Sequence, residues 1–241
     1  LSTSLIGVLN SKQLSAMTTD QVASLTTAQL PSFASESLKG WSAAQVVAWS
    51  TDNVAALTTA QVSGISIAQV AVLTTTQVQA LETADLAVFA SNQMRALTTA
   101  QVVALTTEQV ASITPTLLGG MTPTQFSAMQ IADLQVLTTS QVASVNSAQL
   151  RALSTDQLVT LTTSQVPSLL PDVVNKLTVG QVAALTTAQI DKLTATQVKA
   201  LTTAQVASLT DAQVAKLTTT QVGALTATQI KGLETADLAA L

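Results

Sequence analysis

An apolar residue stands at every eighth position of the 241-residue chain, from Leu1 to Leu241, without one insertion or deletion. Such gapless repetition predicts one small structural unit copied along the whole chain, because each copy buries its apolar residues against its neighbours. We number the octad from this apolar position, so that residues 201–208, LTTAQVAS, form a typical copy. Residues 1–241 are therefore predicted to form a single array, whose length reflects copy number rather than the number of globular domains.

Two further positions of the octad are strongly restricted. Position 6 is apolar in all thirty copies, position 5 is Gln in 22 of them, and position 2 is Ser, Thr, Asn or Asp in 24. The apolar spacing alternates between five and three residues, whereas one face of a strand requires even spacing. One continuous helix would turn each copy about 80° from the last, so that no apolar seam would persist. The pattern predicts one short helix in each octad.

The ends of this helix can be placed from its capping residues. Thr202 and Gln205 have the spacing of a capping box, in which the hydroxyl accepts from a backbone N–H and the Gln reaches back to the cap. Leu201 and Val206 have the spacing of a hydrophobic staple. Three of the five prolines stand at position 3, where a first helical residue needs no N–H: Pro115, Pro123 and Pro171.

The charged residues also follow the predicted helix direction. Twelve of thirteen acidic residues lie at positions 2 to 5 and eight of nine basic residues at positions 7 and 8, the exceptions being Asp191 and Lys12. This arrangement complements a helix dipole. We expect a helix of roughly five to seven residues that starts at position 3 and is stable only when packed on its neighbours.

The fold class predicted is all-α: a solenoid of about thirty short capped helices, with two continuous apolar ladders inside. The small residues at position 8 are expected to allow close approach of helices, and Trp41 and Trp49 to point into the core rather than to stack on sugars. We expect irregular octads where proline or glycine interrupts a helix and where an apolar residue replaces Gln: Pro31, Pro167, Gly119-Gly120, Leu5, Leu117 and Val173.

The chain offers little material for chemistry. It contains no His and no Cys, and its many Ser and Thr residues recur at capping positions. The carboxylate pairs Glu82/Asp85 and Glu234/Asp237 have capping-box spacing, and a calcium site would need more oxygen ligands. We therefore predict no enzyme, no cofactor, and no catalytic, cofactor-binding or metal-binding residue.

Composition also restricts the partners. Charged residues make up 9% of the chain and its nine basic residues form no cluster, which argues against nucleic acid and anionic membrane surfaces. No apolar run approaches the roughly 18 residues of a membrane span, so no membrane insertion is expected. The Thr row at position 3 raises an ice-binding hypothesis, although Ile67, Ile131 and Val179 interrupt this row.

The octad resembles the LTTAQVAA-type tandem repeats of large repetitive secreted or surface proteins of bacteria, most clearly at residues 177–241. This resemblance covers the whole chain and implies an extended, adhesin-like scaffold without functional residues. Residues 105–113, LTTEQVASI, are also similar to the first helix of transcription-activator-like effector repeats, which begin L-T-P-x-Q-V. Those repeats add a base-reading loop and a second helix, both missing here, so this likeness implies a short capped helix and no DNA reading.

These observations favour a structural repeat segment that acts as an extended spacer, stalk or scaffold, extracellular or on a bacterial cell surface. The alternative is a module that binds a protein, peptide or glycan in the solenoid groove, with the less regular residues 31–53 and 115–135 as candidate surfaces. Since both terminal residues fall in register, we expect a fragment of a longer array. Its uncapped ends are candidates for self-association.

Overall fold

Short helices joined by tight corners make up the computed structural model, which describes residues 2–233 and 235. Over this part of the chain there are 27 α-helices and two 3-10 helices, with no strand. Every one of these α-helices begins at position 3 of its octad and has four to six residues, slightly fewer than the predicted five to seven. The all-α solenoid of one capped helix per octad is confirmed.

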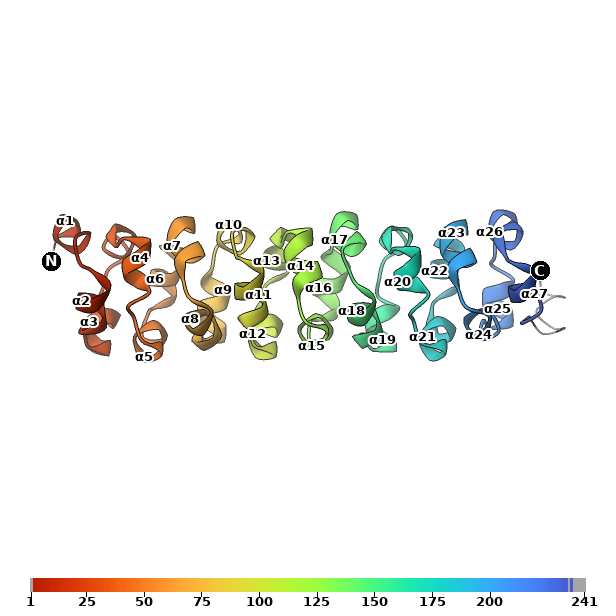
Figure 1. Ribbon diagram of the computed structural model, residues 1–241, viewed down its shortest axis with the longest axis horizontal. Coiled ribbons are helices and arrows are strands. Elements are labelled where there is room, and N and C mark those ends of the chain that lie inside the picture. Colours follow the sequence, from red (N-terminus) through yellow and green to blue (C-terminus); the bar gives the residue numbers. More distant parts are fainter. Residues whose placement is uncertain (1, 234, 236–241) are drawn as a thin grey trace. The chain divides into compact units, whose positions relative to one another are not determined.

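The chain divides into two compact units, of which the first is Leu1–Met121. Its helices follow one another in chain order along the stack (Figure 1). They are α1 Thr3–Ile6, α2 Ser11–Ser15, α3 Thr19–Ala23, η1 Leu30–Ser32, α4 Ser35–Leu38, α5 Ala43–Val47, α6 Thr51–Ala55, α7 Thr59–Gly64, α8 Ile67–Val72, α9 Thr75–Ala80, α10 Thr83–Ala87, α11 Ser91–Ala96, α12 Thr99–Ala104, α13 Thr107–Ser112 and α14 Pro115–Gly120.

The second unit, Thr122–Leu241, is built in the same way. Its described helices are α15 Pro123–Ser127, α16 Ile131–Val136, α17 Thr139–Ala143, α18 Ser147–Ala152, α19 Thr155–Leu158, η2 Val166–Ser168, α20 Pro171–Val174, α21 Val179–Ala184, α22 Thr187–Lys192, α23 Ala195–Ala200, α24 Thr203–Val206, α25 Asp211–Val214, α26 Thr219–Ala224 and α27 Ala227–Ile230. None of the described helices is long and apolar enough to cross a membrane.

Each helix packs on the helices three octads before and after it. In the first unit α4 contacts α7 and α10 contacts α13, and in the second unit α15 contacts α18 and α20 contacts α23. One turn of the coil therefore takes three octads, or 24 residues. Consecutive helices form the three sides of a turn, and the octads of the next turn lie directly on them.

Two apolar ladders fill the inside of the coil, as predicted. From Ile6 to Val214 the side chains at position 6 are at most 2% exposed, and from Phe33 to Leu209 those at position 1 are between 2% and 7% exposed. If each of these side chains contributes about 2 kcal/mol on burial, the ladders supply the main stabilisation of helices that are too short to persist alone.

The two tryptophans belong to the position 1 ladder. Trp41 packs edge to face against both Phe33 and Trp49, with ring centroids 5.2 Å apart in each pair. Both indoles are 3% exposed, so neither offers a surface to a sugar. Neither indole N–H has a hydrogen-bond partner within the described residues, which costs about 1–3 kcal/mol for each buried group.

Position 8 is where the turns approach most closely. A Cβ added at Gly40 would lie 2.1 Å from the backbone oxygen of Ser11, at position 3 in the preceding turn. A Cβ at Gly64 would lie 3.3 Å from Cβ of Ser35, and one at Gly120 would be 3.8 Å from Cβ of Ser91. The small residues at position 8 therefore allow the close approach that the sequence predicts.

The prolines act as predicted. Pro115, Pro123 and Pro171 are each the first residue of an α-helix. Pro31 and Pro167, at position 7, lie in the two octads that form a 3-10 helix in place of an α-helix. Proline has no N–H for the bond to the carbonyl four residues earlier, so the tighter 3-10 turn replaces it.

The irregularity predicted at Leu117 and Gly119-Gly120 is wrong. α14 is an ordinary six-residue helix whose first turn is capped by the Thr114 hydroxyl. Leu117 is 4% exposed, so its side chain fills the space of the missing Gln with apolar contacts. Around Val173 and Leu5 the helices are indeed short, with four residues each, and their N-caps make no side-chain hydrogen bond.

Candidate functional site

The side chain at position 5 is the most heavily used polar group in the molecule. In the octad of α7, the N–H of Thr58 donates to Oε1 of Gln61 at 3.0 Å, and the N–H of Gln61 donates to the Thr58 hydroxyl at 3.2 Å. This reciprocal pair is the predicted capping box, and the same pairing recurs along both units. The sequence prediction of the helix start is confirmed.

The other end of the same amide joins two turns of the coil. Nε2 of Gln61 donates to the carbonyl oxygens of Phe33 and Leu30, which lie 28 and 31 residues earlier, at 2.8 and 2.9 Å. Those carbonyls belong to the C-terminal end of η1 and would otherwise be unsatisfied. One buried Gln, 1% exposed, therefore caps the start of its own helix and the end of the helix four octads before it.

This inter-turn joint is repeated throughout the described residues. The bond to the carbonyl 28 residues earlier is between 2.6 and 3.0 Å long in every printed case. In the first unit the donors to it are Ser37, Gln45, Asn53, Gln61, Gln69, Gln77, Gln93, Gln101 and Gln109. In the second unit they are Gln157, Gln165, Gln181, Gln189, Gln197, Gln205, Gln213, Gln221 and Gln229.

Sequence reasoning missed this role of position 5. A capping box uses only the amide oxygen, and Glu would serve it equally well. Gln was present in 22 of 30 copies and Glu in none. Ser37 and Asn53, the polar substitutes in the first unit that carry a neutral donor, still reach Leu9 O and Leu25 O at 2.8 and 3.0 Å. The preference for a donor was the signal that could have revealed the joint.

Asp85 lacks this donor. It stands at position 5 of α10, is 2% exposed, and accepts the Glu82 N–H at 3.3 Å. The carbonyl 28 residues earlier, that of Leu57, receives no hydrogen bond from any described residue. Burial raises the pKa of Asp85 to about 6, against the lowering effect of the Glu82 N–H, and the Glu82 carboxylate raises it further. Burial also raises the pKa of Asp133, the equivalent residue of α16.

The predicted Glu82/Asp85 pair does not converge on a metal site. Asp85 is buried, whereas Glu82 is exposed at the surface. Over residues 2–233 and 235, no three acidic, His or Cys residues are grouped so that they could hold a metal ion. Glu234 and Asp237 lie outside the described residues.

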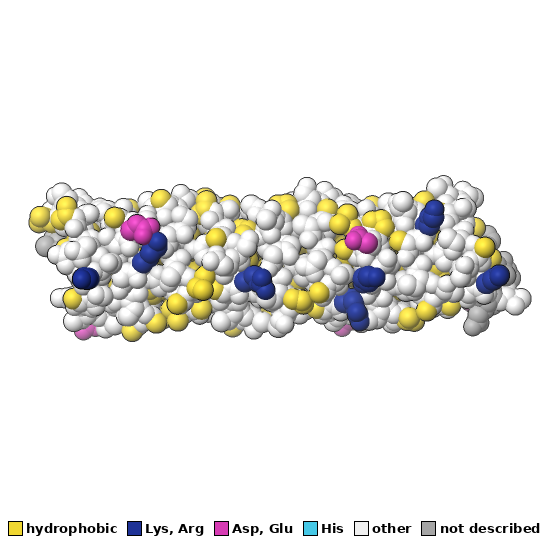
Figure 2. Space-filling view, in the orientation of Figure 1, with side chains coloured by type: hydrophobic (Ala, Val, Ile, Leu, Met, Phe, Trp, Pro, Cys, Tyr) yellow, Lys and Arg dark blue, Asp and Glu magenta, His cyan; other side chains and the backbone are white. Residues whose placement is uncertain are grey.

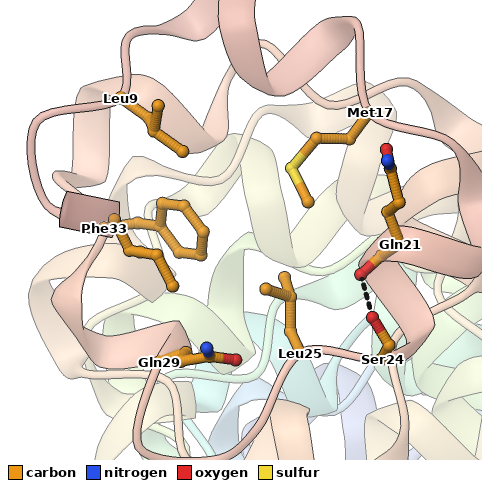
Figure 3. A pocket seen from close by; sticks show the side chains of 8 residues that line it. Leu9, Met17, Gln21, Ser24, Leu25, Gln29 and Phe33 are labelled. Carbon is orange, nitrogen blue, oxygen red and sulfur yellow. Dashed lines mark hydrogen bonds between the residues drawn. The ribbon is translucent and has the colours of Figure 1, made fainter. Parts of the chain in front are cut away.

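A cavity of about 380 Å³ opens at the N-terminal face of the first unit (Figure 3). Leu9, Met17, Leu25 and Phe33 point toward its centre, and the amide of Gln21 lies at its rim. Leu9, Met17 and Leu25 are half-buried, unlike the position 1 residues further along the coil. The cavity is thus the point where the apolar ladder is not covered by another turn.

A second concave surface of about 310 Å³ lies on the outside of the first unit. It is bordered by Lys39, the segment 63–67 and residues of α11, including Asn92. Ile67 is 51% exposed there. Basic side chains elsewhere on the surface are scattered, as the view in Figure 2 shows for one face of the molecule.

The threonines of position 3 form columns rather than one row. Because three octads make a turn, residues 24 apart stack on the same side of the coil. Ile67 therefore interrupts a different column from the one made of five exposed threonines in the first unit: Thr3, Thr27, Thr51, Thr75 and Thr99. Ile131 and Val179, 46% and 48% exposed, confirm that position 3 faces outward in the second unit.

Together these features define a class of protein, an α-solenoid of octapeptide repeats held by a side-chain amide at every corner. The family model described as ALTTAQ repeat matches residues 78–115, 126–163 and 174–211, ranges that begin at the same position of the octad. The chain is therefore an ALTTAQ-type tandem-repeat region. Comparison with curated protein sequences finds no match.

Proposed function

We propose that this chain is a non-enzymatic spacer, stalk or scaffold segment. The observation that carries the proposal is the inter-turn joint, which is built from the same side chain at nearly every corner of both units. A joint that involves only neighbouring turns allows an array to be lengthened without changing any interface. Such a segment sets a distance between whatever is attached to its two ends.

The location proposed is outside the cell, in a secreted or surface protein of a bacterium, where the segment would act as part of an adhesin-like array. The likeness of the octad to the repeats of such proteins supports it. The surface chemistry is compatible, because the exposed positions are mainly uncharged Thr, Ser and Ala.

Small-angle X-ray scattering on dilute protein tests the spacer proposal. Thirty octads at three per turn make about ten turns, and a spacing of 8–10 Å between packed helices gives a length of about 90 Å. A rod of that length has a radius of gyration of about 27 Å, whereas a compact domain of this size has about 18 Å. A value near the compact limit would contradict the spacer.

The alternative, a binding module, has one observation in its favour, the concave surface around Ile67. An apolar side chain bordered by Lys39 and Asn92 suits a peptide or glycan with both apolar and polar groups. Screening a peptide library and a glycan array with the protein and with an Ile67→Asp variant tests it. Ligands captured by the protein and lost in the variant would favour binding over spacing.

A further inference from the structure

The N-terminal face of the first unit carries one half of the inter-turn joint. Gln13 and Gln21 use their amide oxygens in capping boxes, accepting from Asn10 N and Thr18 N at 2.9 Å. Both side chains are exposed, and neither Nε2 donates a hydrogen bond to any described residue. The same group at Gln45 donates to two carbonyls. This face therefore presents donors without acceptors.

The apolar part of the same face is also incomplete. Leu9, Met17 and Leu25 border the 380 Å³ cavity and remain half-buried, whereas Leu73 and Leu81 in the same ladder are 5% and 3% exposed. Inside the coil, position 1 side chains reach this degree of burial because turns lie on both sides of them. The cavity has the chemistry of the space that one more turn of octads would fill.

The last described turn of the second unit carries the complementary half. Leu217 and Leu225 are half-buried, and their carbonyls accept no hydrogen bond from the described residues. In the turn before, the equivalent carbonyls of Leu185 and Leu193 accept from Gln213 and Gln221 at 2.6 and 2.7 Å. This face presents acceptors without donors.

We propose that the N-terminal face binds the last turn of a second copy of this chain, head to tail. Amides of Gln13 and Gln21 would donate to carbonyls of the second copy, and its position 1 and position 6 side chains would fill the cavity. The contact reproduces the interface already present between turns, and the octad register continues because Leu1 and Leu241 both stand at position 1.

The polarity of the two faces fixes the mode of assembly. Two N-terminal faces bring donors against donors, and two C-terminal faces bring acceptors against acceptors, so neither symmetric pair completes a joint. A head-to-tail contact leaves one free face on each end of the assembly and does not close at two copies. The expected products are open-ended chains whose mean length grows with concentration.

A pair of variants matched in charge tests the proposal. Gln13→Glu with Gln21→Glu keeps an oxygen for each capping box but replaces the donor with a carboxylate that repels carbonyls. Ala28→Glu with Ala44→Glu adds the same charge at exposed position 4, where Glu108 already occurs. Sedimentation velocity at about 1–500 µM should show the mass of the unchanged protein and the alanine variant rising above 24.7 kDa and past the dimer.

The glutamine variant is expected to associate at least tenfold more weakly, with an unchanged far-ultraviolet circular dichroism spectrum. A second variant, Met17→Lys, places a charge in the cavity and should weaken association without touching either amide. A protein that stays at 24.7 kDa throughout, a plateau at the dimer, or equal association of the glutamine and alanine variants would each overturn the proposal.

Discussion

At the scale of single residues, one side-chain amide serves two helices that are four octads apart. Its oxygen satisfies an N–H at one helix start and its nitrogen satisfies carbonyls at another helix end, as Gln101 does for Thr98 N and for Val70 O and Leu73 O. Helix termini leave such groups unsatisfied, and helices of four to six residues consist largely of termini. A repeat this short depends on a residue that serves both ends at once.

Replacing one of these amides should therefore be costly only where both of its functions operate. Gln101→Leu, which mimics the natural Leu117, leaves one buried N–H and two buried carbonyls unpaired and is expected to lower the free energy of unfolding by about 2–4 kcal/mol. Gln13→Leu loses only an exposed capping bond and should cost well under about 1 kcal/mol. Urea denaturation followed by circular dichroism compares them, and equal losses would contradict the joint.

Asp85 should make stability depend on pH. Its folded pKa of about 6 lies above the ordinary value of 3.8, so its contribution is fully present below about pH 4 and is lost as pH rises to about 6. Asp85→Asn supplies a neutral donor, as Asn53 does for Leu25 O. The variant should be more stable than the unchanged protein by on the order of 2 kcal/mol at pH 7.5 and by little at pH 4.

Thermal denaturation of both proteins across this pH range measures that difference. Asp133, whose pKa is also raised, is present in both and cancels in the comparison. A constant difference between pH 4 and pH 7.5 would mean that the Asp85 carboxyl does not titrate in this range.

Glycines at position 8 and elsewhere should respond differently to a methyl group. Gly40→Ala places a Cβ against the backbone of Ser11 and should cost about 1–3 kcal/mol. Gly180→Ala, at an exposed position of α21 with no atom within 4 Å of the added Cβ, should gain up to about 1 kcal/mol from helix propensity. Melting temperatures of the two variants provide the test, and a neutral Gly40→Ala would argue against close contact between turns.

At the scale of the element, the octad is the unit that can be added or removed. Deleting residues 201–208 keeps the 28-residue separation between every remaining amide and its acceptor position. Deleting residues 201–207 breaks this separation for each joint that spans the deletion, including those of Gln213, Gln221 and Gln229. The eight-residue deletion should fold with one octad fewer, whereas the seven-residue deletion should lose protection in residues 209–233.

Hydrogen exchange followed by mass spectrometry measures that protection segment by segment. If both deletions keep residues 209–233 protected, the joints are not what holds this turn in place.

Most of the individual element could be predicted from the sequence. The capping residues, the prolines at position 3 and the two 3-10 octads at Pro31 and Pro167 all depend on interactions within a few residues. The number of octads in a turn could not be predicted, because it depends on how corners at positions 8, 1 and 2 stack over 24 residues. The inter-turn role of Gln61 required that number, so it was missed with it.

At the scale of the whole molecule, stability is expected to be graded along each unit rather than uniform. Val22 N and Val102 N make the same local bond, to Thr18 O at 3.0 Å and to Thr98 O at 2.9 Å. Val22 lies in the face bordering the open cavity, and Val102 lies within the stack. Since neighbouring turns supply most of the stabilisation, the Val22 amide should exchange with solvent at least about tenfold faster.

Amide exchange measured by nuclear magnetic resonance at a concentration where the protein is monomeric tests this gradient. Equal exchange rates would indicate that the unit unfolds as one cooperative body, in which case the nearest-neighbour description does not apply.

The three-octad turn has a consequence for how such a chain can vary over generations. Slippage during DNA replication adds or removes whole repeats, and eight codons leave each joint intact. Because an octad is one third of a turn, such an event would change the direction in which everything beyond it faces as well as its distance. Only a gain or loss of three octads would restore the original heading, so repeat number in genes of this type would set azimuth and reach together.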